Sequence, residues 1–151
     1  MQKLDTFQLK VNYNPEVLEV VGPEGGEGVT DGKIGNTTVP VSMWAFSPKG
    51  VPGTLFILGN VPGVTGVLGS GFLAHIHFKV VEGSSGTTYI TFSDGHLWDN
   101  GNPPSEIDVE EWIGDNVFIM SAQIITMEIS TPIEVQQGEE FAADVVITES
   151  K

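Results

Sequence analysis

Two histidines in this sequence have the spacing of metal ligands. His75 and His77 lie two residues apart in the apolar run Phe72–Val81, so on a strand both imidazoles would lie on one face. A zinc site needs three or four ligands, and only His96 or a carboxylate distant in sequence is available to complete this one. We therefore predict no metal at this pair.

Oxygen ligands are concentrated in a second segment, Ser93–Asp108. Their spacing does not match the calcium loop of an EF-hand, in which ligands alternate through D-x-[DN]-x-[DN]-G. We interpret the segment as a solvated, charged loop, with a structural calcium as the alternative, and we expect Trp98 to cap the core beneath it. The oxygen-bearing side chains are Asp94, Asp99, Asn100, Asn102, Glu106 and Asp108.

The motifs of the common enzyme classes are absent from the sequence. It has no cysteine for a thiolate nucleophile, no G-x-S-x-G elbow, no H-E-x-x-H and no phosphate-binding glycine loop. Twenty Asp and Glu residues place some carboxylates close together in any fold, but the distances of a glycosidase pair are not visible in a sequence. We expect a non-catalytic protein without a cofactor.

Length and composition indicate a single all-β domain. The chain has 151 residues, enough for one domain with a core of its own. Nineteen glycines and nine prolines, spread along the whole length, leave little room for helices. Recurrent runs of Thr, Val and Ile favour strands.

The charge of the chain argues against two classes of partner. Its formal net charge is −14, with only six Lys and Arg residues, whereas nucleic acids and anionic membranes are bound by clustered basic side chains. No apolar run approaches the ~20 residues of a membrane-spanning helix. The first residues, Met1–Asp5, do not resemble a signal peptide.

The strand that organises the chain lies near its N-terminus. Between residues 7 and 13 apolar and polar side chains alternate, which is the pattern of a strand with one buried face. Pro15 lacks an N–H and ends this strand, and a second apolar run, Val17–Val21, follows at once. The buried set is Phe7, Leu9, Val11 and Tyr13, and the outward set is Gln8, Lys10 and Asn12.

Further strands are predicted along the chain, separated by connectors rich in Gly and Pro. Trp44 lies in the apolar segment Thr38–Phe46, whose two faces the pattern does not distinguish. It is therefore either a core residue or a surface anchor. The clearest further strands are Thr54–Leu58, Phe72–Val81, Thr87–Phe92 and Asn116–Met120.

The chain resembles a cohesin domain, the module of cellulosome scaffolds that receives a dockerin. The resemblance is carried by the strand, proline corner and VLEVV run of residues 7–21, by GFLAHIHFKV at residues 71–80, and by LWDNGN, IDV and NVFIM in the expected order. It implies a nine-stranded jelly-roll β-sandwich. It also implies an extracellular or cell-surface protein that binds a dockerin-like partner.

By the same resemblance the partner docks on the sheet that contains the Phe7 strand. We predict that the outward face of this strand binds the partner, with an aromatic anchor from a neighbouring strand. A carbohydrate-binding module shares the jelly-roll architecture and is an alternative, but three tryptophans and two tyrosines make a planar aromatic strip hard to assemble. The predicted partner-binding residues are Thr6, Gln8, Lys10, Asn12 and Trp44.

The order of the strands departs from the family pattern. A cohesin begins with two strands ahead of the equivalent of Phe7–Tyr13, and here six residues precede it. Ile125–Ser150 resembles that opening, with a turn at Gly138-Glu139 between two apolar strands. We therefore divide the chain into a sandwich body, residues 1–120, and a C-terminal strand pair, residues 121–151. This order indicates a circular permutation or a segment cut out of register from a tandem array.

The C-terminal pair is predicted to complement another molecule. In cohesins the first and last strands run parallel, so the end of NVFIM and the start of ITMEIS should lie at opposite ends of the sandwich. Ser121–Ile124 reaches only ~13–14 Å when extended, and a strand is ~17–20 Å long. Reciprocal exchange would give a closed dimer and head-to-tail donation an open filament, so a structural fibre subunit is the main alternative function. The exchanged apolar side chains are Val135, Phe141, Val145 and Ile147.

Overall fold

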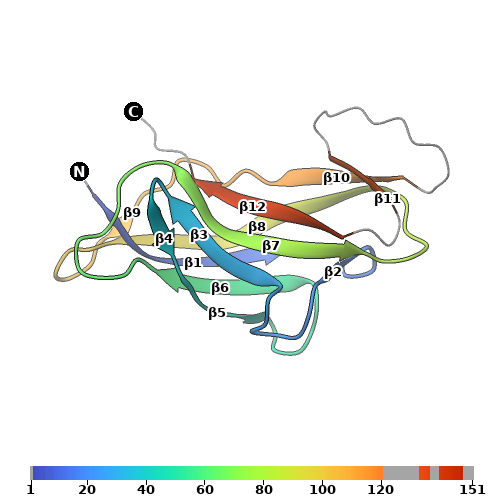
Figure 1. Cartoon of the computed structure of the whole chain (residues 1–151), viewed down its shortest axis with the longest axis horizontal. Coiled ribbons are helices and arrows are strands. Elements are labelled where there is room, and N and C mark those ends of the chain that lie inside the picture. The colour runs from blue at the N-terminus through green and yellow to red at the C-terminus, as the bar shows by residue number, and fades with distance from the viewer. Residues whose placement is uncertain (1, 121–132, 137–139, 148–151) are drawn as a thin grey trace.

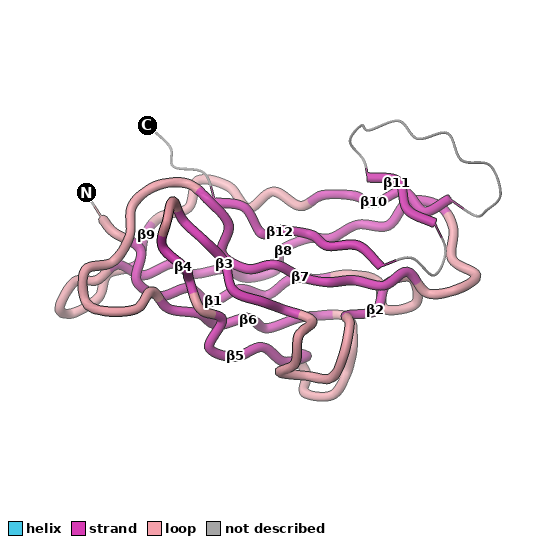
Figure 2. Tube along the Cα trace, in the orientation of Figure 1, coloured by secondary structure: helices cyan, strands magenta, loops and turns pink. Residues whose placement is uncertain are grey.

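The structure is a computed structural model that describes residues 2–120, 133–136 and 140–147 (Figure 1). Within these residues it contains twelve strands and no helix, and loops join the strands (Figure 2). The predicted strand start at Ile125 and the predicted turn at Gly138-Glu139 lie outside these residues. The strands are β1 (Leu4–Asn12), β2 (Leu18–Val20), β3 (Val29–Ile34), β4 (Thr37–Val39), β5 (Val41–Phe46), β6 (Thr54–Asn60), β7 (Gly71–Val80), β8 (Gly86–Asp99), β9 (Glu106–Ile107), β10 (Asp115–Met120), β11 (Ile133–Gln136) and β12 (Glu140–Ile147).

The strands form two sheets that share one core. The first has the order β11-β10-β8-β1-β6-β5, with β9 added on β8, and the second has the order β12-β7-β3-β4, with β2 added on β7. Buried side chains of both sheets belong to a single cluster, so the prediction of an all-β sandwich is confirmed. The described part has twelve strands where the cohesin resemblance implies nine, and three of them, β2, β4 and β9, are only two or three residues long.

The central strand of the first sheet is β1, which pairs antiparallel with β6 and with β8. Its inner side chains Phe7, Leu9 and Val11 are at most 1% exposed and lie in the same core cluster as Phe78 of β7. Gly59 on β6 leaves room for the Phe7 ring, since a Cβ at this position would lie 2.3 Å from Phe7 Cε1. The predicted alternation of this strand is therefore confirmed.

The C-terminal strands add to both sheets of their own chain. β12 pairs antiparallel with β7, with Phe141 opposite Phe78, and the two rings stack with centroids 5.8 Å apart. Val145 is 7% exposed and joins the core. β11 pairs parallel with β10, which confirms the predicted parallel arrangement, and Val135 lies opposite Ile119 in this register.

In the structure both C-terminal strands pair with their own chain, β11 with β10 and β12 with β7 as far as Ile147. The predicted connection, Ser121–Ile124, lies outside the described residues. The structure contains one chain, so pairing of these strands with another molecule stays a prediction.

We expect Val145→Asp to destabilise the protein, because it places an unpaired carboxylate in the core. The free energy of unfolding, measured with urea, should fall by about 3 kcal/mol or more. Thr38→Asp is the matched control, since Thr38 is exposed on β4 and a surface change alters stability by about 0.5 kcal/mol at most. Equal stability of the two variants would contradict the docking of β12 on β7.

Candidate functional site

The outward face of the β8-β1-β6-β5 sheet carries the polar half of β1. The polar residues of β1 are half-buried and alternate along the strand with its buried core residues. They are Thr6, Gln8, Lys10 and Asn12. Because successive side chains of a strand point to opposite faces, these residues lie on the outside of the sheet. They form a row along the middle of the face, since β1 lies between β6 and β8.

On one side of this row the face is apolar. In the antiparallel register Gln8 lies opposite Leu58, and Lys10 lies opposite Phe56, both on β6. Leu58 in turn lies opposite Met43 on β5. Leu58 and Phe56 are half-buried and Met43 is 47% exposed. The face therefore offers apolar area beside hydrogen-bonding groups.

On the other side of the row the face is charged and aromatic. Gln8 lies opposite His96, and Lys10 lies opposite Asp94, both on β8. Trp98 follows two residues after His96 and is half-buried on the same face. The two flanks of the β1 row thus differ in chemistry, so a partner that is apolar on one side and polar on the other can dock in one orientation only.

The sequence pattern does not place Asp94, His96 and Trp98 on the outward face of the sheet. The register between β8 and β1 shifts between Phe92 and Asp94, so Ser93 is an extra residue in the ladder. Such a β-bulge reverses the alternation that follows it. As a result Phe92 and Leu97 both contribute to the core although they are five positions apart, an odd number that a strict alternation would place on opposite faces. A strict period of two therefore predicts the wrong face for one half of β8.

Hydrogen bonds hold the ends of the β1 row. Asn12 Oδ1 accepts from Thr54 Oγ1 at 2.8 Å and from Ser93 Oγ at 3.4 Å. At the other end, Thr6 Oγ1 donates to Asp5 Oδ2 at 3.1 Å. Side chains that are already ordered lose less conformational entropy when a partner binds. The two ends of the row are therefore pre-organised.

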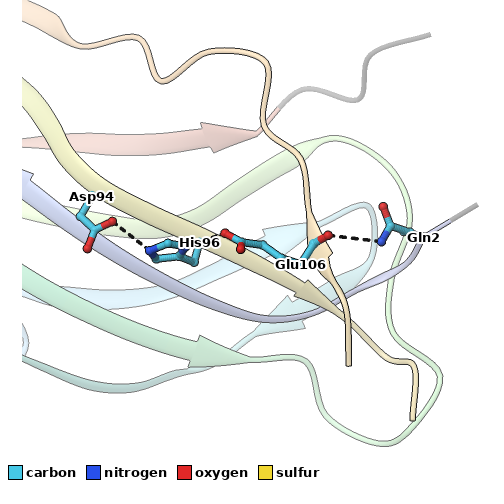
Figure 3. A network of polar contacts seen from close by, with 4 residues as sticks. All are labelled: Gln2, Asp94, His96 and Glu106. Atoms are coloured by element: carbon cyan, nitrogen blue, oxygen red, sulfur yellow. Dashed lines mark hydrogen bonds and ion pairs between the residues drawn. The ribbon is translucent and has the colours of Figure 1, made fainter. Parts of the chain in front are cut away.

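His96 lies between two carboxylates (Figure 3). Its Nε2 lies 2.9 Å from Asp94 Oδ1, and its Nδ1 lies 2.5 Å from Glu106 Oε1. Glu106 comes from β9, which pairs with β8 beside the ring. The imidazole also stacks on Trp98, with centroids 5.6 Å apart. The hydrogen bond with Glu106 raises the pKa of His96 above its usual 6.5, and the charge of Asp94 acts in the same direction.

Asp99 stabilises the loop that follows β8. Its Oδ1 accepts from the backbone N–H groups of Ser105 at 2.8 Å and Gly101 at 3.0 Å, and its Oδ2 accepts from Gln2 Nε2 at 3.1 Å. These bonds, that of Ser105 first, lower the pKa of Asp99. Its oxygens therefore already bind groups of the chain itself. In the part of the chain that the structure describes, no three His, Cys, Asp or Glu side chains gather in a metal-binding arrangement.

The structure decides the positions of two tryptophans. Trp44, which the sequence left as a core residue or a surface anchor and which was included among the partner-binding residues, is 3% exposed, and its Nε1 donates to the carbonyl of Gly26 at 2.8 Å. It is therefore a core residue, because the alternation of β5 turns it inward. Trp98, expected to cap the core, lies on the outer face beside the histidine. Trp112 packs against the core, so the tryptophans do not form the planar strip of a carbohydrate-binding module.

The histidine pair of β7 lies in the other sheet. The ring centroids of His75 and His77 are 4.6 Å apart, and both side chains are half-buried on the outward face of the strand. His96, which the sequence left open as a third ligand, belongs to the first sheet. The structure therefore does not bring the three histidines together.

The fold and the face together define a class of protein. A sandwich that presents a row of polar side chains between an apolar and a charged flank has the anatomy of a protein-binding module. The family model of the cohesin domain matches residues 2–108, a range that includes the whole β8-β1-β6-β5 face. The chain belongs to the cohesin family, whose members are non-catalytic modules of protein–protein interaction.

A search of curated proteins found no match to this chain. The described residues contain no helix of the length and apolar character that crossing a membrane requires.

We expect Glu106→Gln to lower the pKa of His96, because it removes the strongest acceptor of the imidazolium. An NMR titration of the imidazole C–H signals measures this pKa, which should lie above 6.5 in the unmodified protein. Glu110→Gln removes the same charge at an exposed position further along the chain and should change the pKa less. A wild-type pKa at or below 6.5 would contradict the geometry of the cluster.

Proposed function

We propose that this domain is an extracellular or cell-surface receptor for a dockerin-like partner, which docks on the outward face of the β8-β1-β6-β5 sheet. One observation carries the proposal: the row of Thr6, Gln8, Lys10 and Asn12 runs along the middle of this face. Membership of the cohesin family supports the class of partner. The cohesin resemblance supports the choice of the sheet that contains β1.

The chemistry of the face fits a specific interface. Protein interfaces combine an apolar centre, rich in aromatic residues and Met, with hydrogen bonds around it. Here Met43, Phe56 and Leu58 supply apolar area, and Gln8 and Asn12 supply hydrogen-bonding groups beside it. A complementary partner therefore carries an apolar patch over β6 and β5 and hydrogen-bonding groups over β1.

We also propose that β11 and β12 take the place of the two opening strands of a cohesin. The support is the parallel pairing of β11 with β10 and the pairing of β12 with β7, since the first and last strands of a cohesin run parallel. The sandwich body, residues 1–120, and the C-terminal pair, residues 121–151, then form one domain in permuted order.

A double variant tests the docking face. Gln8→Arg with Asn12→Arg should raise the Kd for a dockerin that binds the unmodified protein by about 30-fold or more, because two bulky charges then lie at the centre of the interface. The fold should persist, since both positions are half-exposed. Binding is measured by isothermal titration calorimetry against a panel of dockerins.

Thr38→Arg provides the control for this experiment, because Thr38 is exposed on β4 in the other sheet and its substitution should leave the Kd unchanged. Undiminished binding by the double variant would move the interface off this face. If no dockerin in the panel binds the unmodified protein, the receptor function loses its support.

The alternative function is a subunit of a fibre or surface assembly, formed when β11 and β12 dock on a neighbouring copy. The observation that favours it is the contribution of Phe141 and Val145 to the core, which the same strand of a second copy would supply equally well. We rank it below the receptor because both strands pair with their own chain.

Light scattering decides between these assemblies. We expect a mass of one chain, 16.2 kDa, that does not change with protein concentration, because each molecule completes its own sheets. A stable mass of two chains would indicate reciprocal exchange. A mass that grows with concentration would indicate head-to-tail donation and would place the fibre subunit first.

A further inference from the structure

His96 makes contacts that only its protonated ring satisfies. Both ring nitrogens lie within 2.9 Å of a carboxylate oxygen, one from Asp94 and one from Glu106. A neutral imidazole has one N–H donor and one lone pair, so one of these contacts would then place a lone pair against a carboxylate oxygen. The imidazolium donates at both nitrogens and fits the observed geometry.

The charged groups around the ring come from three strands. Asp94 lies on β8 itself, Glu106 faces the ring from β9, and Lys10 lies on β1 opposite Asp94. The residue directly opposite His96 is the neutral Gln8. Histidine is the side chain whose ordinary pKa lies close to neutral pH, so His96 is the group in this cluster whose charge can switch there.

The contact between His96 and Glu106 joins two strands. β9 is two residues long and pairs with β8 only where Leu97 lies opposite Ile107 and Trp98 lies opposite Glu106. So short a ladder has few backbone hydrogen bonds. Next to it, Asp99 bonds to the backbone of Ser105, and Gln2 Nε2 donates to the carbonyl of Glu106 at 3.5 Å. The contact with His96 is therefore one of a small number of attachments of β9. Losing this contact therefore weakens β9 more than it would weaken a long strand.

We propose that His96 is a pH-sensitive latch, which holds β9 against the edge of the β8-β1-β6-β5 face when protonated and releases it when the proton is lost. The charged ring bridges Asp94 and Glu106, whereas the neutral ring donates to one of them. Because the pKa of His96 is raised by folding, the latch is closed below pH 6.5 and opens as the pH rises through the folded-state pKa.

The latch has a consequence for binding that rests on the proposed function. When it opens, the cluster of Asp94, His96 and Glu106 changes from one net negative charge to two, and the edge beside β8 loosens. A dockerin that contacts this flank then binds with an affinity that depends on pH. By linkage, its binding also shifts the pKa of His96.

Amide hydrogen exchange of the isolated protein tests the latch without a partner. The protection of the β9 amides and of the paired β8 amides, corrected for the intrinsic pH dependence of exchange, should fall about twofold to fivefold as His96 deprotonates. The methyl signals of Ile107 should shift with the same midpoint as the imidazole. His96→Gln and Glu106→Gln should abolish this step. His77→Gln, which changes a histidine in the other sheet, should retain it.

Constant protection across the transition, or an equal step in His96→Gln, would overturn the latch. A separate measurement uses any dockerin that binds: its Kd should change with the same midpoint in the unmodified protein and stay constant in His96→Gln. A constant Kd in both proteins would overturn the regulation of docking. If no dockerin binds, the proposed function fails, while the exchange experiment still decides whether the latch exists.

Discussion

The candidate docking face depends on the burial of one side of β1. Phe7, Leu9 and Val11 are packed into the core between the sheets, and because the faces of a strand alternate, this burial turns Gln8 and Lys10 outward. A slip of one residue would exchange the two sets and bury a lysine. Pairing with β6 on one side and β8 on the other holds the register. The same apolar contacts that stabilise the fold therefore orient the candidate binding residues.

The second sheet depends in the same way on the C-terminal strand. β7 pairs with β3 on one side and with β12 on the other. Without β12, the edge of β7 and the ring of Phe78 would lose the cover of Phe141. Although the two parts of the chain are separate in sequence, the sandwich body and the C-terminal pair share one core and are expected to unfold together.

The charge of the docking face differs from that of the chain as a whole. The protein carries a formal net charge of −14, yet the middle of the face holds Lys10 opposite Asp94, and His96 between Asp94 and Glu106. These cations reduce local repulsion and allow carboxylates to lie close together on the surface. His96 is the member of this group whose charge changes near neutral pH. In the proposed latch, the charge of His96 and the order of the strand at this edge are therefore coupled.

Several features were determined by the sequence alone, because they depend on short-range periodicity and on strand order. The all-β class, the inner and outer sets of β1 and the cohesin family belong to this group. The positions of Trp44 and Trp98 were decided by the tertiary structure, since residues on either face of a sheet can be apolar and a bulge in β8 reverses its alternation. The His96 cluster also required the tertiary structure. Glu106 reaches the ring only because β9 folds back on β8. Which strands pair depends on the path of the loop between them, and the local pattern of apolar residues does not show this path.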